Sequence, residues 1–184
     1  MTSAREQLIS ELREHALVVG EVTLSSGLVA QYYVDAKRAI LRPAGFGAMA
    51  RLIADAARRH GASAVGGLTM GADAPACAAL AGGAEVSAFF VRKEAKQHGL
   101  QRRVEGPLLK APARCLIVED VVTTGGSTVQ AIEAVKAEGH SVVAVVSILD
   151  RLAGGAEAIQ AAAPDAAYEA LATIDDVYPG RPDR

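Results

Sequence analysis

Two adjacent acids, Glu119 and Asp120, follow an apolar run in the stretch CLIVEDVVTTGGSTVQAI (115–132). Hydroxyl side chains and a pair of glycines come shortly after them, in TTGGST (123–128). Glycines let the backbone fold tightly and turn N–H groups toward an anion, and the positive end of the following helix points at the same place. The stretch therefore predicts a phosphate cradle. It is not a Walker loop, because no lysine follows the glycines.

The two acids need their own explanation, since Glu119 and Asp120 would repel a bare phosphate. Carboxylates accept hydrogen bonds well from vicinal sugar hydroxyls, so the acids fit a ligand that carries a ribose diol close to its phosphate. A sugar phosphate fits both halves of the stretch. The structural alternative is an ordinary joint in which the acids cap a turn and the glycines shape the chain.

The order of an apolar strand, two acids, two variable residues and Thr-Thr-Gly-Gly-Ser resembles the signature of the type I phosphoribosyltransferases. The resemblance implies a Rossmann-like core with a hood and a flexible loop, and phosphoribosyl pyrophosphate as a substrate. It implies that Glu119 and Asp120 hold the 2′ and 3′ hydroxyls, with Asp120 also among the catalytic residues. The substrate-binding residues that it implies on the loop are Val121, Val122, Thr123, Thr124, Gly125, Gly126 and Ser127, the last five around the 5′-phosphate.

A basic stretch, FFVRKEAKQHGLQRR (89–103), follows a predicted buried strand. From Arg92 to Arg103 it holds five Lys or Arg residues against one acid, and it lacks a helical period. Such a run is either a solvated charged loop or a cationic lid suited to a pyrophosphate leaving group.

Within this stretch, VRKEAKQHG resembles the catalytic loop of the orotate phosphoribosyltransferases. The resemblance implies a flexible loop over about 92–110 whose Arg92, Lys93, Lys96 and His98 contact the pyrophosphate. Lys96 is then the main catalytic residue, and Lys93 and His98 complete the catalytic set with Asp120. In that family the loop reaches into the partner subunit's site, so the resemblance also implies a homodimer with a shared loop.

The stretch GEVTLSSGLVAQYYVD (20–35) resembles the N-terminal hood of the same enzymes. Many members carry a lysine where this chain has Ser25, which is expected to face the base. Tyr32 and Tyr33 match the aromatic pair beside the pyrimidine, and their alternative role is ordinary strand packing. The resemblance therefore places all three residues in the substrate site.

Arg151 ends a predicted buried strand in ILDR (148–151). A guanidinium can bind the carboxylate of orotate through two parallel hydrogen bonds. A single arginine at a strand end is otherwise a common surface ion-pair partner. Its match to the family pattern implies that Arg151 is the carboxylate anchor.

The stretch GGLTMGADAPA (66–76) corresponds in position to the pyrophosphate loop of the family. Many members have a bulky residue and a lysine where this chain has Gly71 and Ala72. The backbone of this loop can still hold pyrophosphate or its metal, with Asp73 acting through water. What replaces the missing lysine is left open by the sequence.

The resemblance implies transfer of a 5-phosphoribosyl group from phosphoribosyl pyrophosphate to orotate, giving orotidine 5′-monophosphate and pyrophosphate. Mg²⁺ is the expected cofactor, held mainly by substrate oxygens and water rather than by protein ligands. Two alternatives remain. A phosphoribosyltransferase for another base would lack the RKEAKQHG loop, and a regulator that senses phosphoribosyl pyrophosphate would lose the basic loop or gain a DNA-binding segment.

Predicted strands and helices alternate along the chain, which indicates the α/β class with a mainly parallel sheet flanked by helices. A capping box at Ser3 and Glu6 begins the first helix. Further helices are predicted over 43–60, 74–81, 127–138 and 153–163. Strands are predicted within 18–35 and over 63–70, 85–91, 114–119, 141–149 and 168–171.

The bulk properties fit one domain over 1–184, with a hood formed mainly by 1–40 and C-terminal residues. A formal charge of −2 does not favour nucleic acid, and no apolar run is long enough for a membrane span. Cys77 and Cys115 are expected to be buried, reduced thiols of a cytoplasmic protein. The tail YPGRPDR (178–184) is expected to fray.

Overall fold

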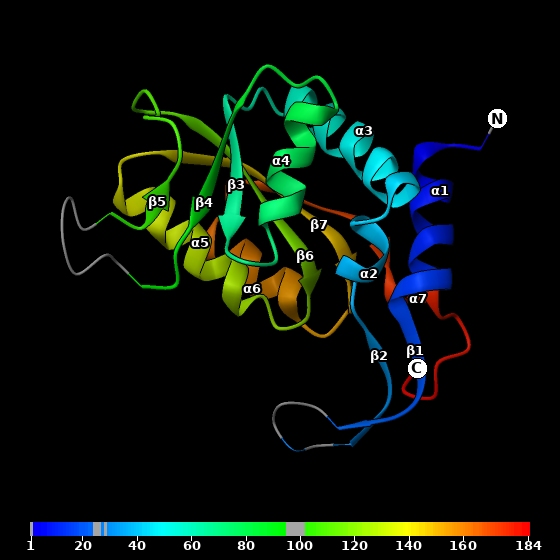
Figure 1. Ribbon diagram of the computed structural model, residues 1–184. Coiled ribbons are helices and arrows are strands. Elements are labelled where there is room, and N and C mark those ends of the chain that lie inside the picture. Colours follow the sequence, from blue (N-terminus) through cyan, green and yellow to red (C-terminus); the bar gives the residue numbers. More distant parts are fainter. Residues whose placement is uncertain (1, 24–26, 28, 95–101) are drawn as a thin grey trace.

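The computed structural model in Figure 1 describes residues 2–23, 27, 29–94 and 102–184. Its centre is a six-stranded sheet with the order β5-β4-β3-β6-β7-β8, in which only the short edge strand β5 runs antiparallel to its neighbour. The strands are β3 (Ala64–Leu68), β4 (Ser87–Val91), β5 (Val104–Glu105), β6 (Arg114–Val122), β7 (Ser141–Asp150) and β8 (Ala167–Thr173). The predicted α/β class with a mainly parallel sheet is confirmed.

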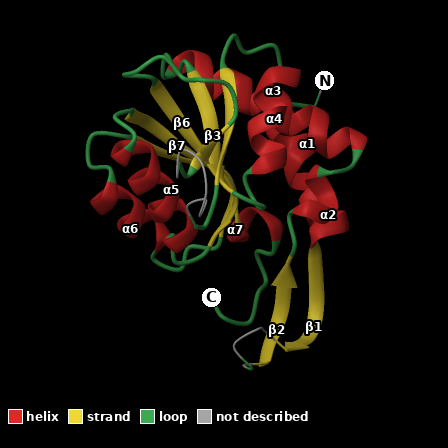
Figure 2. Cartoon of the chain, turned by 60° about the vertical axis from the view of Figure 1, so that its left-hand side comes forward, coloured by secondary structure: helices red, strands yellow, loops and turns green. Residues whose placement is uncertain are grey.

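Helices cover both faces of this sheet, with α1, α3 and α4 on one side and α5 and α6 on the other (Figure 2). Their bounds are α1 (Ala4–Glu11), α3 (Pro43–Arg59), α4 (Asp73–Ala81), α5 (Gly126–Ala137) and α6 (Gly155–Ala162). Each face has its own apolar cluster, and alanines of α3 and α4 let these helices pack closely. The near-continuous apolar sequence of β6 follows from its burial on both faces.

The hood is an antiparallel hairpin of β1 (Leu17–Thr23) and β2 (Val29–Val34), which projects from the body beside the C-terminus (Figure 1). A π-helical turn, η1 (Leu12–Ala16), leads from α1 into β1, and α2 (Lys37–Ile40) follows β2. The capping box predicted at Ser3 and Glu6 is present. A last short helix, α7 (Ile174–Val177), follows β8.

Chain order reverses between β3 and β6, which are neighbours in the sheet. The helix after β3, α4, lies on one face, while the helix after β6, α5, lies on the other (Figure 2). The chain therefore leaves these two strands toward opposite faces of the sheet, and open α/β sheets bind ligands at such a switch point. The stretch with the two acids ends at this point.

Three expectations from the sequence are wrong. Cys77 is exposed, whereas Cys115 is buried as expected. The segment 102–110 is not all irregular loop, because β5 pairs with β4 and the backbone N–H groups of Arg103 and Val104 both donate to Glu138 Oε1, at 3.1 and 3.0 Å. The tail packs on the hood and forms side-chain hydrogen bonds instead of fraying.

Candidate active site at the strand switch point

Glu119 and Asp120 lie at the carboxyl end of β6 with only 4% and 7% of their surface exposed. Neighbouring side chains on a strand point to opposite faces, so the two carboxylates meet different partners. Glu119 faces the start of α5 and Asp120 faces α2. The two carboxylates therefore lie between the predicted phosphate cradle and α2.

Glu119 is held by hydroxyl groups from the first turn of α5. Its Oε2 accepts hydrogen bonds from Ser127 Oγ at 2.6 Å and from Thr128 Oγ1 at 3.4 Å. Burial is the main cause that raises the pKa of Glu119 to about 7; the nearby charge of Asp120 adds to it, and the hydrogen bond from Ser127 opposes it. This carboxyl can therefore gain or lose a proton near neutral pH.

Asp120 is paired with Lys37, the first residue of α2. Lys37 Nζ lies 2.9 Å from Asp120 Oδ2 and 3.2 Å from Asp35 Oδ1, and the other oxygen of Asp120 accepts from the backbone N–H of Val121 at 2.8 Å. Burial lowers the pKa of Lys37, but its hydrogen bonds and attraction to Asp120 and Asp35 together raise it above the ordinary value.

Sequence reasoning missed Lys37. Its one sequence cue is that a cation follows directly after the hood stretch that ends in Asp35. No spacing rule connects it to an acid on a strand 83 positions later.

The loop after β3 lies against the two carboxylates. A Cβ built on Gly71 would lie 2.6 Å from Asp120 Oδ1 and 2.7 Å from Glu119 Oε1, so this position has no room for a side chain beside the acids in their present positions. Asp73 begins α4 and accepts from Thr69 Oγ1 at 2.8 Å, while its Oδ1 is buried without a hydrogen-bond partner in the described structure. The structure thus places Asp73 on the loop that adjoins the acids.

The predicted phosphate cradle spans the end of β6 and the start of α5. Gly125 caps the helix with φ +79°, and a Cβ there would lie 2.8 Å from the carbonyl oxygen of Gly155, so glycine is required on both counts. Thr123, Thr124 and Gly126 are exposed, and a Cβ on Gly126 would meet nothing within 4 Å. Open backbone at a helix N-terminus is suited to an anion.

Two of the residues expected to bind substrate point into apolar packing. Val122 is 1% exposed and belongs to the core cluster on the α5 side, and Val121 packs against the cluster on the opposite side. Val122 also uses its carbonyl oxygen to accept from the backbone N–H of Arg151 at 2.8 Å. The side chain and the carbonyl oxygen of Val122 are therefore both engaged within the fold.

Arg151 follows β7 at the same edge of the sheet. Its guanidinium lies over the ring of Tyr32, with 4.9 Å from Cζ to the ring centroid, and its Nε is buried without a hydrogen-bond partner among the described residues. Tyr33 is 39% exposed and points to the other face of the hairpin from Tyr32, which is 4% exposed. The two tyrosines therefore cannot act as one aromatic pair on one face.

A buried polar chain holds the turn that carries Arg151. Asp150, 3% exposed, accepts from the backbone N–H of Leu152 and from Tyr168 OH, both at 2.7 Å. The hydroxyls of Tyr168 and Ser147 lie 3.0 Å apart. Leu152 has φ +55°, an uncommon conformation for this residue type, which the hydrogen bond to Asp150 helps to hold.

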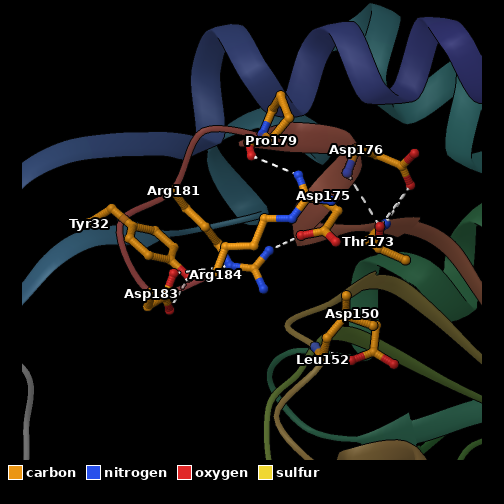
Figure 3. Close-up of polar contacts among 10 residues, drawn as sticks. All are labelled: Tyr32, Asp150, Leu152, Thr173, Asp175, Asp176, Pro179, Arg181, Asp183 and Arg184. Carbon is orange, nitrogen blue, oxygen red and sulfur yellow. Dashed lines mark hydrogen bonds and ion pairs between the residues drawn. The ribbon is translucent and has the colours of Figure 1, made fainter.

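The C-terminal tail packs against Tyr32, and Figure 3 shows the tyrosine beside Asp183 of the tail. Tyr32 OH donates to Asp183 Oδ2 at 3.0 Å, and its ring meets the ring of Tyr178 edge to face at 5.4 Å. Arg181 pairs with Asp175 and lies 3.0 Å from Asp183 Oδ1 through its Nε. Residues distant in sequence thus hold the ring beneath Arg151.

The base of the basic loop lies beside the loop after β3. Arg92 and Lys93 line an open depression of about 740 Å³ together with Thr69 and Met70. Arg92 is also 3.9 Å from Glu105. The structure therefore brings two of the residues predicted to contact pyrophosphate next to the loop after β3.

The expected site residues Ser25, Lys96 and His98 lie outside the described residues. The remaining predicted polar residues lie along the carboxyl edge of β3, β4, β6 and β7, apart from Tyr32 and Tyr33 on β2, of which Tyr32 contacts Arg151. Within the described ranges, no group of three or more His, Cys, Asp or Glu residues could hold a metal ion by itself. No helix in the same ranges has the length and hydropathy to cross a bilayer.

Comparisons with known proteins agree with this geometry. The family model for the "Phosphoribosyl transferase domain" matches residues 43–162. An orotate phosphoribosyltransferase of Streptomyces coelicolor is 49% identical over 164 residues, which cover 87% of this chain and 90% of that protein. One from Corynebacterium glutamicum is 44% identical over 175 residues, covering 95% and 94%. The crystal structure of Mycobacterium tuberculosis orotate phosphoribosyltransferase with 5-phospho-α-D-ribosyl 1-diphosphate is 36% identical, with TM-score 0.80 over 95% of this chain and 98% of that chain.

Proposed function

The chain belongs to the phosphoribosyl transferase family and, within it, to the orotate phosphoribosyltransferases, and from this premise we propose how its residues divide the reaction. The reaction transfers the 5-phosphoribosyl group of phosphoribosyl pyrophosphate to orotate and yields orotidine 5′-monophosphate and pyrophosphate, a step of pyrimidine synthesis. The observation that carries the residue roles is the nearly buried pair Glu119 and Asp120 between an open cradle and the loop after β3.

We propose that Glu119 and Asp120 accept hydrogen bonds from the ribose hydroxyls. The 5′-phosphate is held by Thr123, Thr124, Gly125, Gly126 and Ser127, together with backbone of the residues before them. Support comes from the exposure of the Thr123, Thr124 and Gly126 positions beside acids that are themselves enclosed. A diol and a phosphate on one small ligand match these two adjoining surfaces.

Arg151 is proposed as the group that binds the orotate carboxylate, with Tyr32 beneath it. The buried Nε without a partner supports this role, because a carboxylate can take hydrogen bonds from the edge of a guanidinium. Arg92 and Lys93, with Lys96 and His98, are proposed to neutralise the departing pyrophosphate. As the C1–O bond breaks, the charge on the leaving oxygens grows, and fixed cations lower the barrier.

Mg²⁺ is proposed as the cofactor, bound mainly by substrate oxygens and water. Among the described residues, the chain offers Mg²⁺ only single oxygens, such as the Oδ1 of Asp73 on the loop after β3, which has no hydrogen-bond partner. When bound, the ion would supply positive charge to the diphosphate oxygens and hold them in one geometry. The protein residues orient the sugar and close off water around that group.

A cytoplasmic homodimer that shares its basic loops between subunits is also proposed. The two cysteines are unpaired, as in proteins of a reducing compartment. Mixing Lys96→Ala protein with Asp120→Asn protein tests the shared loop, since each inactive variant has what the other lacks. If loops cross between subunits, random exchange should restore about a quarter of the wild-type sites. No recovery after verified exchange would contradict the shared loop, and a monomer in light scattering would contradict the dimer.

The direct test of function is the loss of orotate absorbance with phosphoribosyl pyrophosphate and Mg²⁺, beside adenine, hypoxanthine and uracil as competing bases. Orotate should be the base consumed. Arg151→Ala should raise the KM for orotate by at least about tenfold, because a charge-assisted bidentate contact is lost, and should change the KM for the sugar substrate little. An unchanged orotate KM would remove Arg151 from the site.

A further inference from the structure

Lys37 is a cation held beside the two acids of the candidate site. Its ammonium contacts Asp120 at 2.9 Å and Asp35 at 3.2 Å, yet its side chain remains 44% exposed. An ammonium has three N–H donors, so two carboxylates leave it one for another acceptor. Among the described residues, no other Lys or Arg forms an ion pair with Asp120 or Glu119.

The loop after β3 cannot provide such a cation itself. A side chain at Gly71 would collide with both carboxylates, at 2.6 and 2.7 Å from its Cβ. Ala72 is completely buried, and its Cβ lies 2.7 Å from the position that a Cβ on Gly67 would take. A lysine at either position would therefore displace the acids or the packing beneath the loop. The cation that pairs with Asp120 comes from α2 instead.

Asp120 connects Lys37 to this loop. Its Oδ1 faces Gly71, while its Oδ2 contacts Lys37 Nζ, so a single carboxylate separates the ammonium from the loop. If a ribose hydroxyl donates to Asp120, it competes with the ammonium for the same oxygen. The ammonium can then stay on Asp35 and direct its remaining N–H groups to the anion beside the loop.

We propose that Lys37 binds the diphosphate of phosphoribosyl pyrophosphate and serves in place of a cation on the loop after β3. In the free enzyme the same ammonium compensates the charge of Asp120. When the substrate binds, the ribose hydroxyls replace it there and the diphosphate becomes its partner. This inference rests on the proposed function, because it takes the sugar diol to lie on Asp120.

Three ligands separate this role from a merely structural one. Calorimetric titration with Mg²⁺ present would compare phosphoribosyl pyrophosphate, pyrophosphate and ribose 5-phosphate on wild type and Lys37→Met. Loss of a charge-assisted contact should raise the Kd of the first two ligands by about tenfold or more, and that of ribose 5-phosphate by less than about threefold. Lys37→Arg, which keeps the charge, should recover part of the affinity.

Lys136→Met is the matched control, because Lys136 donates to the carbonyl oxygen of Ala162 between α5 and α6 and lies outside the site. It should leave all three Kd values unchanged. If Lys37→Met raises the Kd of ribose 5-phosphate as much as that of the two diphosphate ligands, Lys37 acts only through Asp120. If Lys37→Met leaves all three Kd values unchanged, Lys37 does not bind the diphosphate. Either result overturns the proposal. If Lys37→Met does not fold, Lys37→Gln gives the same comparison. A wild type that consumes no orotate would instead refute the proposed function.

Discussion

Replacing Glu119 by glutamine should make protein stability less sensitive to pH. The carboxyl is 4% exposed, and its burial raises the pKa from 4.5 to about 7 in the folded protein. The carbonyl oxygen of glutamine can still accept from Ser127 Oγ, so Glu119→Gln removes the buried charge while it keeps the main contact. The substitution therefore isolates the free energy of burying that charge.

The sign follows from proton binding. Between pH 4.5 and 7 the folded protein keeps a proton on Glu119 that the unfolded chain has lost, so the free energy of unfolding falls as pH rises through this window. The rise from 4.5 to about 7, at about 1.4 kcal/mol for each pKa unit, corresponds to roughly 3 kcal/mol over the full window. Most of this change, about 2 to 3 kcal/mol, is expected between pH 5 and pH 8.

Denaturant unfolding of both proteins at pH 5 and pH 8 measures this effect. The free energy of unfolding of the variant should rise by about 2 to 3 kcal/mol relative to that of wild type between the two pH values, because all other titrating groups are shared. Glu133→Gln, which neutralises an exposed carboxyl on α5, is the matched control and should show no such divergence. If the difference between Glu119→Gln and wild type is the same at both pH values, the burial argument is refuted.

Two further substitutions test the supports of the site by steady-state kinetics. Tyr168→Phe removes a hydrogen bond from buried Asp150 and should raise the orotate KM about two- to tenfold through a looser Arg151, with little change in kcat; a fall in kcat at constant KM would argue against this. Gly71→Ala should push the two acids apart and raise the KM for phosphoribosyl pyrophosphate about tenfold or more. Gly126→Ala has open space at its Cβ and should leave stability intact. If Gly71→Ala unfolds at the same midpoint as Gly126→Ala, the rise in KM caused by Gly71→Ala is a local effect at the two acids.

The alternation of apolar runs and helical patterns predicted most of the fold, because each parallel strand is buried on both faces and each helix returns the chain to the same edge. The same logic placed Glu119 and Arg151 at one edge. It missed the orientation of α4, whose alanine-rich sequence has little helical periodicity and so did not reveal that Cys77 faces outward.

The hood was harder to predict, because its side chains are sorted by a hairpin register that the sequence does not specify. The family resemblance placed both Tyr32 and Tyr33 beside the pyrimidine, and alternation on β2 buries Tyr32 while it exposes Tyr33. The polar tail suggested fraying, yet Asp183 finds the hydroxyl of Tyr32 at 3.0 Å. In both cases tertiary contacts decided the outcome, and local composition carried no information about them.

The contact between Lys37 and Asp120 could not be predicted from the sequence, although the burial of two adjacent acids creates a need for it. Adjacent carboxylates with 4% and 7% exposure repel each other and are poorly hydrated, so the folded protein must protonate one or neutralise the other. It does both, since the pKa of Glu119 is raised and Asp120 is paired with Lys37. The need for a compensating cation could have been inferred from the two adjacent acids in the sequence. The sequence does not show which of the many Lys and Arg residues meets that need. Lys37 of α2, 83 positions earlier in the chain, is brought to Asp120 by the fold alone.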